Sequence, residues 1–245
     1  MSFGDYALIV VCAMGASVVG GIAGYGTGLL MPLVLVPLVG AEAVVPILAV
    51  AAIFTNVSRI IAFREHIDWP RVWRVLVVAL PATFIGAAAY TWLNGPGAAI
   101  LIGSALILLV PARYLLKRLQ GEMSPRAALG AGGVFGLVSG AVPGAGIILI
   151  SMLMALGLKG PAIIATDAAI SFVVGLVKIA TYQSFGGLPA SSWTVALLIG
   201  AAGVPGAFLA KWLTQRLSLG VHQRIMDATV ILGGSVLLLR GLGWL

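Results

Sequence analysis

Apolar stretches, each about 20 residues long, follow one another along nearly the whole of this sequence. A helix of about 20 residues crosses the roughly 30 Å of hydrocarbon in a lipid bilayer. The composition agrees with a membrane protein, because 61% of the residues are hydrophobic and 9% are charged, whereas soluble domains have roughly 45–50% and 25%. A backbone in lipid must satisfy its own hydrogen bonds, so these stretches are predicted to be helices. We therefore predict an all-α polytopic membrane protein.

Other classes of structure fit the sequence poorly. Residues 98–110 and 230–239 are apolar on every face, whereas the strands of a membrane β-barrel alternate. The first residues, MSFGDY, lack the basic region of a secretory signal, so we expect the first hydrophobic stretch to be retained. Cys12 is the only cysteine, which excludes disulfides within the chain and Cys-rich metal sites. His66 and His222 lie beside charged loops and are expected to be solvated, so neither a metal nor a cofactor is predicted.

The second half of the chain repeats the first at an offset of 120 positions. Both members of two tryptophan pairs match, which is hard to attribute to chance even in a chain with 33 glycines. The matching residues are Gly24, Gly26, Gly40, Trp73, Gly86 and Trp92 in the first half, and Gly144, Gly146, Gly160, Trp193, Gly206 and Trp212 in the second. We therefore predict two repeats, 1–118 and 127–245, joined by a cytoplasmic linker at 119–126.

The basic residues predict the orientation, because Lys and Arg gather in cytoplasmic loops. Twelve of the 14 lie in segments that we assign to the cytoplasm: Arg59, Arg64, Arg71, Arg74, Arg113, Lys117, Arg118, Arg126, Lys159, Lys211, Arg216 and Arg224. The loops near 94–97 and 183–192 contain none and are expected outside. The equivalent helices 44–63 and 161–182 then run in opposite directions, so the repeats are predicted to have inverted topology.

Inverted repeats require an odd number of crossings in each half. The predicted crossings are 44–63, 71–93 and 97–116 in the first repeat, and 161–182, 192–214 and 222–242 in the second. The remaining stretches, 5–39 and 127–158, must each return to the side where they began, so each is predicted to be a helical hairpin with a glycine-rich turn. Their arms of about 14–17 residues either span barely or form a re-entrant pair that meets near the midplane.

The glycine-rich turns are the first candidate site. They read GGIAGYGTG at 20–28 and GLVSGAVPGAG at 136–146. A helix that begins after such a break presents unpaired N–H groups and the positive end of its dipole, which suits an anion. The candidate binding residues are Gly24, Tyr25, Gly26, Thr27, Gly28, Ser139, Gly144, Ala145, Gly146 and Asn56. The alternative is that the four-residue glycine spacing serves close helix packing.

Charged residues inside apolar helices are the second candidate site, because each is costly in a bilayer and usually faces a partner or an aqueous cavity. Asp167 and Arg59 lie at similar depths from the cytoplasmic ends of equivalent helices, which predicts a salt bridge or a gate. Lys178 and Glu42 are candidates for a matching pair outside. The alternative for Arg59 and Lys178 is that their side chains reach to the lipid headgroups.

Two glycine-rich hairpins, each followed by a helix of small residues, resemble the sulfite exporter TauE/SafE family, also called TSUP. The resemblance covers nearly the whole chain. It rests on GGIAGYGTGLLMPLVL with the following GAEA at 40–43, and on GLVSGAVPGAGIILISMLMALGLKGPAIIATDAAIS at 136–171. The second half departs from the first at Ile147 and Ile148, which stand where the first has Thr27 and Gly28. The resemblance implies a carrier of sulfite, sulfoacetate or another organosulfonate in the cytoplasmic membrane, acting as an exporter.

Our hypothesis is therefore a secondary transporter that exports a small anion, coupled to protons through Asp167. Two alternatives stay open at this point, a passive anion channel and an intramembrane enzyme. An enzyme would need clustered catalytic side chains, and the nearest cluster, Glu65, His66 and Asp68, is better interpreted as a solvated turn. The expected partners are the anion and the bilayer, and nothing indicates nucleic acid. The sequence leaves open whether the chain forms a homo-oligomer.

Overall fold

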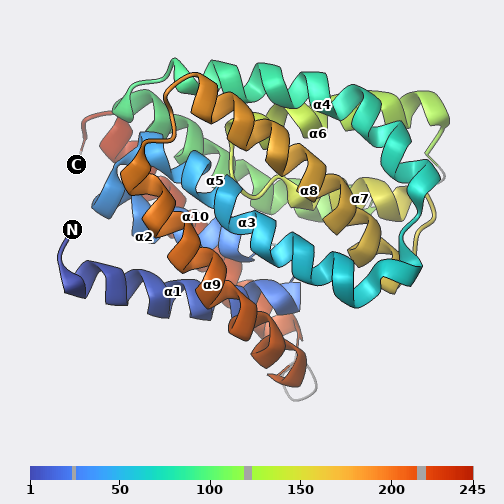
Figure 1. Ribbon diagram of the computed structural model, residues 1–245, viewed down its shortest axis with the longest axis horizontal. Coiled ribbons are helices and arrows are strands. Elements are labelled where there is room, and N and C mark those ends of the chain that lie inside the picture. Colours follow the sequence, from blue (N-terminus) through green and yellow to red (C-terminus); the bar gives the residue numbers. More distant parts are fainter. Residues whose placement is uncertain (24–25, 119–122, 214–218, 245) are drawn as a thin grey trace.

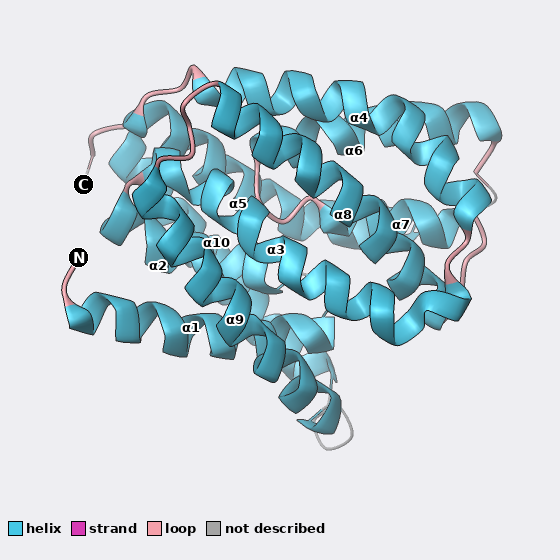
Figure 2. Ribbon diagram, viewed as in Figure 1, coloured by secondary structure: helices cyan, strands magenta, loops and turns pink. Residues whose placement is uncertain are grey.

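The computed structural model describes residues 1–23, 26–118, 123–213 and 219–244, and within these ranges every regular element is a helix (Figures 1 and 2). The prediction of an all-helical chain is therefore confirmed. The helices are α1 (Phe3–Ala23), α2 (Gly26–Val39), α3 (Ala41–Phe63), the short 3-10 helix η1 (Arg64–His66), α4 (Trp69–Thr91), α5 (Gly95–Arg118), α6 (Pro125–Ala141), α7 (Gly146–Ala155), α8 (Pro161–Ser184), α9 (Ala190–Leu213) and α10 (Leu219–Gly241).

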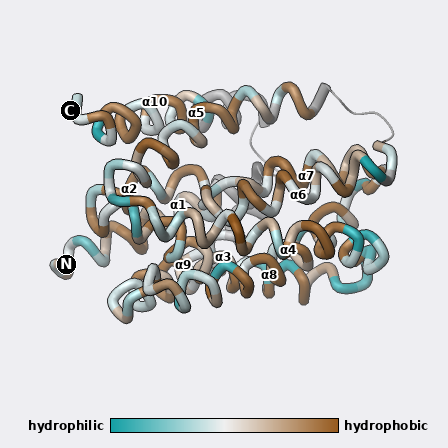
Figure 3. The backbone as a smooth tube through the Cα atoms, turned by 90° about the horizontal axis from the view of Figure 1, so that it is seen from above, coloured by the Kyte–Doolittle hydropathy of each residue, from teal (hydrophilic) through white to brown (hydrophobic). Residues whose placement is uncertain are grey.

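Four helices of the described ranges are long and apolar enough to cross a membrane. They are α3 with its continuation into η1, α4, α5 and α8. Shorter apolar helical segments lie at 3–18, 27–39, 146–155 and 190–206. Figure 3 shows hydrophobic residues along the bodies of the helices and the largest hydrophilic patch at one end of the bundle. This distribution fits a bundle that faces lipid along its length.

The two halves of the bundle contact each other reciprocally. Helix α1 packs against α9, and α6, which the predicted repeat matches to α1, packs against α4, which it matches to α9. In the same way, the contact of α3 with α9 matches that of α8 with α4, and the contact of α2 with α10 matches that of α7 with α5. The pairs α3–α8 and α5–α10 join helices that are each other's counterparts. Exchanging the halves therefore maps most of the helix contacts onto one another.

Close glycine contacts hold these helix pairs together. Gly86 of α4 lies against the backbone of α6 at Leu137 and Gly140. Its counterpart Gly206 lies against α1, where an added Cβ would stand 2.8 Å from the Cβ of Ser17. Helices can approach this closely because glycine has no side chain at the crossing point. The hydroxyl of Ser17 also donates a hydrogen bond to the carbonyl oxygen of Gly203, at 2.6 Å.

The break between α6 and α7 spans fewer residues than the glycine-rich turn at 136–146 that the sequence predicted. Helix α1 continues to Ala23, and α6 continues through Gly136 and Gly140 to Ala141, so α1 has 21 residues and α7 has 10. We expected arms of about 14–17 residues on each side. The reason is that Gly136 and Gly140 lie against the backbone of α4 and serve helix packing. The packing alternative is thus right for these two glycines, and the break is confined to the residues that follow.

Candidate functional site

Three residues between α6 and α7 turn the chain. Val142 is extended, with φ −136° and ψ 150°, because the ring of a following proline disfavours the helical conformation. Pro143 has no N–H and cannot continue the hydrogen-bond ladder of α6. Gly144 has φ +84°, a region that side-chain-bearing residues rarely adopt. The sequence Val-Pro-Gly therefore ends α6 and starts the path into α7.

The first turn of α7 has unpaired backbone donors. Ala145 is the N-cap and supplies no side-chain cap. The amides of Ile147 and Ile148 donate to the carbonyl oxygens of Gly144 and Ala145, at 3.3 and 2.9 Å. Within the described residues, the amides of Gly144, Ala145 and Gly146 donate no hydrogen bond. An added Cβ on Gly146 would meet nothing within 4 Å, so open space lies beside these donors.

The start of α2 lies against this break. An added Cβ on Gly28 would stand 2.9 Å from the backbone nitrogen of Gly144 and 3.2 Å from its Cα. Gly28 is the third residue of α2, so the N-terminal ends of α2 and α7 lie side by side. Each such end carries a partial positive charge of roughly half a unit. The predicted site residues Gly24 and Tyr25 lie outside the described residues, while Gly26 begins α2 and Thr27 is half-buried.

Two polar side chains that we assigned to the site are buried. Ser139 is 9% exposed and lies in the last turn of α6 before the break. Asn56 is 7% exposed and lies on α3, which packs against α2 and α8. In the part of the chain that the structure describes, neither side chain makes a hydrogen bond. Both polar groups are therefore available to a ligand or to water.

An ion pair joins α3 to α8. Nη1 of Arg59 lies 3.5 Å from Oδ2 of Asp167, as the similar depths of the two residues predicted. The side chain of Asp167 is 6% exposed and that of Arg59 is 30% exposed. The other carboxylate oxygen of Asp167, Oδ1, is buried without a hydrogen-bond partner. One oxygen of this buried carboxylate thus has a partner and the other has none.

The second predicted pair is not formed. Among the described residues, no ion pair joins Glu42 to Lys178. Arg59 faces Asp167 and Ile53 faces Gly175, so α3 and α8 run antiparallel. That register places Lys178 level with about position 50, and Glu42 lies roughly 12 Å further along α3. The exposed side chain of Glu42 lies instead beside Gly95, where an added Cβ would stand 3.3 Å from its Oε1.

A network at one end of the bundle was missed from the sequence, where Arg71 was only assigned to a cytoplasmic segment. Asp68 caps α4 by accepting from the amide of Arg71 at 3.0 Å and forms an ion pair with its guanidinium. Nη2 of Arg71 donates to the carbonyl oxygen of Leu156, directly after α7, at 3.0 Å. The amide of Asp68 donates to Oγ1 of Thr166 on α8, at 3.1 Å. The network therefore fixes the end of α7 against α4 and α8.

Two buried tyrosines were also missed. Tyr90 of α4 is 3% exposed and Tyr182 of α8 is 0% exposed. Each hydroxyl donates to a backbone carbonyl oxygen, that of Ala41 for Tyr90 and that of Gly140 for Tyr182. The acceptor of Tyr182 lies in the last turn of α6, before the break between α6 and α7, whereas that of Tyr90 is the first residue of α3. No local pattern in the sequence marks these residues, because their partners are distant in the chain.

Comparison with known proteins places these features in one family. The family model described as sulfite exporter TauE/SafE matches residues 9–237 of the 245. No curated protein and no solved structure matches the chain. The matched span contains the break between α6 and α7, the start of α2 and the ion pair of Arg59 with Asp167.

Proposed function

Because the chain belongs to the sulfite exporter TauE/SafE family, we propose that it is a secondary transporter that exports a small sulfur-containing anion. The substrate class is sulfite, sulfoacetate or another organosulfonate. The chain is a polytopic membrane protein, and its proposed location is the cytoplasmic membrane. The observation that carries this proposal is the contact of Gly28 with Gly144, which brings two helix N-termini together beside unpaired amides.

The proposed anion site lies at these two helix ends. The oxygens of the anion accept hydrogen bonds from the amides of Gly144, Ala145 and Gly146, and the segment 24–28 contributes from the other half. Hydrogen bonds to an ionised acceptor are stronger than neutral ones, and two helix dipoles add favourable potential. Gly28 touches the backbone of Gly144, so the anion occupies the open space beside Gly146.

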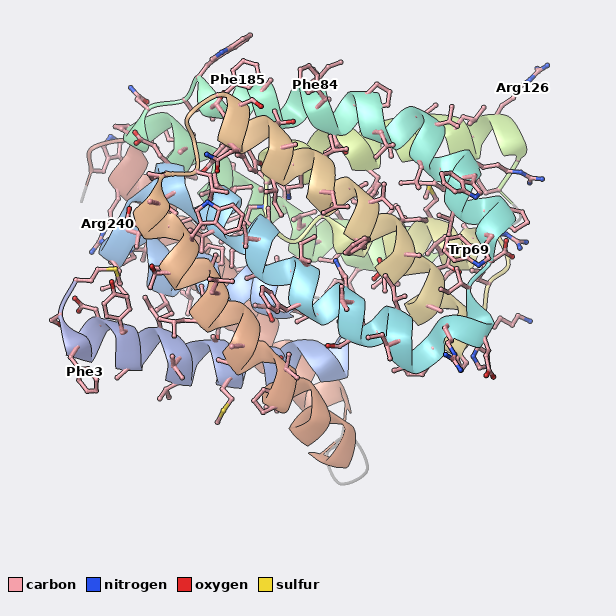
Figure 4. All side chains as sticks on the ribbon, in the orientation of Figure 1. Phe3, Trp69, Phe84, Arg126, Phe185 and Arg240 are labelled. Carbon is pink, nitrogen blue, oxygen red and sulfur yellow. The ribbon has the colours of Figure 1, made fainter. Side chains whose placement is uncertain are left out.

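The proposed architecture is a pair of inverted repeats, 1–118 and 127–245, joined at 119–126. The reciprocal helix contacts support it, as does the close contact of Gly103 on α5 with Gly234 on α10. Trp69 and Arg126 lie at the right end of Figure 4, and Phe3 and Arg240 lie at the left. This arrangement is consistent with a cytoplasmic end and an outer end of the bundle.

In this architecture, α1 with α2 and α6 with α7 are re-entrant hairpins. Helices α2 and α7 have 14 and 10 residues, so they extend roughly 21 and 15 Å, less than the roughly 30 Å of hydrocarbon. Both would then begin inside the membrane and place their N-termini near its midplane. Rocking of the two repeats about that shared site would expose it to each side in turn.

The ion pair of Arg59 with Asp167 is proposed to couple transport to protons. A buried charge is costly unless it is paired, and Oδ1 of Asp167 has no hydrogen-bond partner. A proton bound at Oδ1 would neutralise Asp167 and release Arg59. In this role, Asp167→Asn should abolish uptake driven by a pH gradient while leaving sulfite exchange in place.

Radiolabelled sulfite in proteoliposomes tests the proposed function. We expect uptake that saturates with sulfite concentration and that is accelerated by unlabelled sulfite on the opposite side, because a carrier exposes one site alternately. Flux that neither saturates nor responds to sulfite on the other side would contradict the proposal and indicate a channel.

A matched pair of variants locates the site. An added Cβ meets nothing within 4 Å at Gly146 or at Gly133 of α6, so both positions have space at the point where a side chain begins. We expect Gly146→Val to lower sulfite transport by at least about tenfold, the equivalent of one lost hydrogen bond of about 1.4 kcal/mol. Gly133→Val should transport like the wild type. Equal transport by the two variants would show that the anion does not bind beside Gly146.

A further inference from the structure

Tyr182 takes the carbonyl oxygen that the break between α6 and α7 sets free. In an unbroken α-helix the carbonyl of Gly140 would accept from the amide of Gly144, four residues later. The break removes that bond, and the buried hydroxyl of Tyr182 donates to the Gly140 carbonyl in its place. A buried carbonyl without a partner would be costly, so the hydroxyl stabilises the broken form of the chain.

The consequence is that the amide of Gly144 has no acceptor in the described structure. The carbonyl of Gly140, its partner in an unbroken helix, accepts from the hydroxyl of Tyr182 instead. Gly144 is one of the three residues whose amides form the proposed anion site. By stabilising the broken form, the tyrosine hydroxyl favours the backbone in which this donor is unpaired, at the place where an anion would need it.

Tyr90 holds the ring of Tyr182 from the side. The two ring centroids lie 6.1 Å apart with an interplanar angle of 66°, an edge-to-face contact. The hydroxyl of Tyr90 donates to the carbonyl oxygen of Ala41 at the start of α3, at 2.6 Å, and so makes no bond to the break. Tyr90 is therefore a tyrosine buried like Tyr182, but its hydroxyl donates to a different carbonyl oxygen.

We propose that Tyr182 is a positioning residue for anion binding, which occupies the carbonyl of Gly140 so that the amide of Gly144 stays available to the substrate. This inference rests on the proposed function and assigns a role to a residue outside the site itself. The first repeat has Ala62 at the position equivalent to Tyr182, 120 residues earlier. The first repeat therefore has no hydroxyl at the position that corresponds to Tyr182.

The matched substitutions Tyr182→Phe and Tyr90→Phe test this role in the full-length protein. Each removes one buried hydroxyl and its bond to a carbonyl. In Tyr182→Phe, the carbonyl of Gly140 loses its partner, so the broken form in which the amide of Gly144 is unpaired becomes less stable. We expect the KM for sulfite to rise about tenfold, with the maximal rate within about twofold of the wild type. Tyr90→Phe should keep the KM of the wild type, although both variants lose thermal stability.

A merely structural role for Tyr182 would change the KM equally in the two variants or in neither, and either result would overturn the inference. Absence of saturable sulfite transport by the wild type would instead contradict the proposed function. Hydrogen exchange on the wild type supplies a measurement that needs no folded variant. The amide of Gly144 is expected to exchange freely without sulfite and to be protected by it. Protection in the absence of sulfite would also overturn the inference.

Discussion

Gly28, the third residue of α2, lies directly against Gly144 in the break between α6 and α7. An added Cβ on Gly28 would stand 2.9 Å from the backbone nitrogen of Gly144, closer than side chains normally approach a backbone. The two halves of the chain differ at this position. At the position equivalent to Gly28 the second half has Ile148, which is partly buried and packs on both hydrophobic clusters of the core.

The contact predicts that Gly28→Ala destabilises the protein. The methyl group would overlap the backbone of Gly144, which cannot move aside as a flexible side chain can, and overpacking of this kind costs about 1–3 kcal/mol. Gly15→Ala in α1 is the control, since an added Cβ there meets nothing within 4 Å. Alanine should stabilise that helix by up to about 1 kcal/mol. Thermal unfolding in detergent measures both, and equal stability of the two variants would disprove the close contact.

Substitution by alanine is expected to have opposite effects on stability at two glycines of α6. An added Cβ on Gly136 would stand 2.8 Å from the Cα of Ala79 on α4, whereas one on Gly130 would meet nothing within 4 Å. Gly136→Ala should therefore cost about 1–3 kcal/mol, and Gly130→Ala should be neutral or stabilising by up to about 1 kcal/mol. The difference in melting temperature between the variants checks this assignment. A stabilised Gly136→Ala variant would mean that α4 and α6 pack less closely.

The helical class and the place of the second break follow from local features of the sequence. Hydropathy predicts helices because lipid leaves a backbone few other solutions, and Val-Pro-Gly at 142–144 stops a helix by its own stereochemistry. The roles of Gly136 and Gly140 could not be predicted. A glycine in a turn and a glycine at a helix crossing look alike until the facing helix is known.

Depth along a helix was predictable, but register between helices was not. Counting residues from the helix ends placed Arg59 near Asp167, and the structure has this ion pair. The same counting paired Glu42 with Lys178 and was wrong there, because antiparallel packing offsets them along the axis. Contacts of a side chain with a distant backbone carbonyl, such as that of Tyr182 with Gly140, leave no local pattern in the sequence.

The ion pair predicts an asymmetry between its two partners. Arg59→Gln would leave Asp167 buried and charged without its counter-ion. Breaking a buried pair in this way costs about 3–5 kcal/mol, and the 30% exposure of the Arg59 side chain places the expected loss at the lower end of that range. Asp167→Asn should cost less, because the cation that it leaves behind can reach solvent. Thermal unfolding of each single variant checks the order.

The double variant Arg59→Gln with Asp167→Asn gives the sharper test of that pair. Removal of both charges should restore part of the stability that Arg59→Gln loses, since no buried charge is then left without a partner. A double variant whose loss equals the sum of the two single losses would show that the two residues do not interact. Measurement in the same detergent at one pH keeps the comparison free of changes in other charged groups.

The contacts of Arg71 predict that it contributes more to stability than a neighbouring arginine. Its guanidinium joins Asp68 to the carbonyl oxygen of Leu156 at the C-terminal end of α7, where a helix dipole is negative and a cation is favourable. Arg71→Gln should cost about 1.5–3 kcal/mol, the range for hydrogen bonds to a charged group. Arg74→Gln, which removes an exposed positive charge one turn away, should change stability by less than about 0.5 kcal/mol. Equal losses of stability in the two variants would mean that Arg71 acts only as a surface charge. The expected difference would show that Arg71 fixes the C-terminal end of α7, opposite the end with unpaired amides.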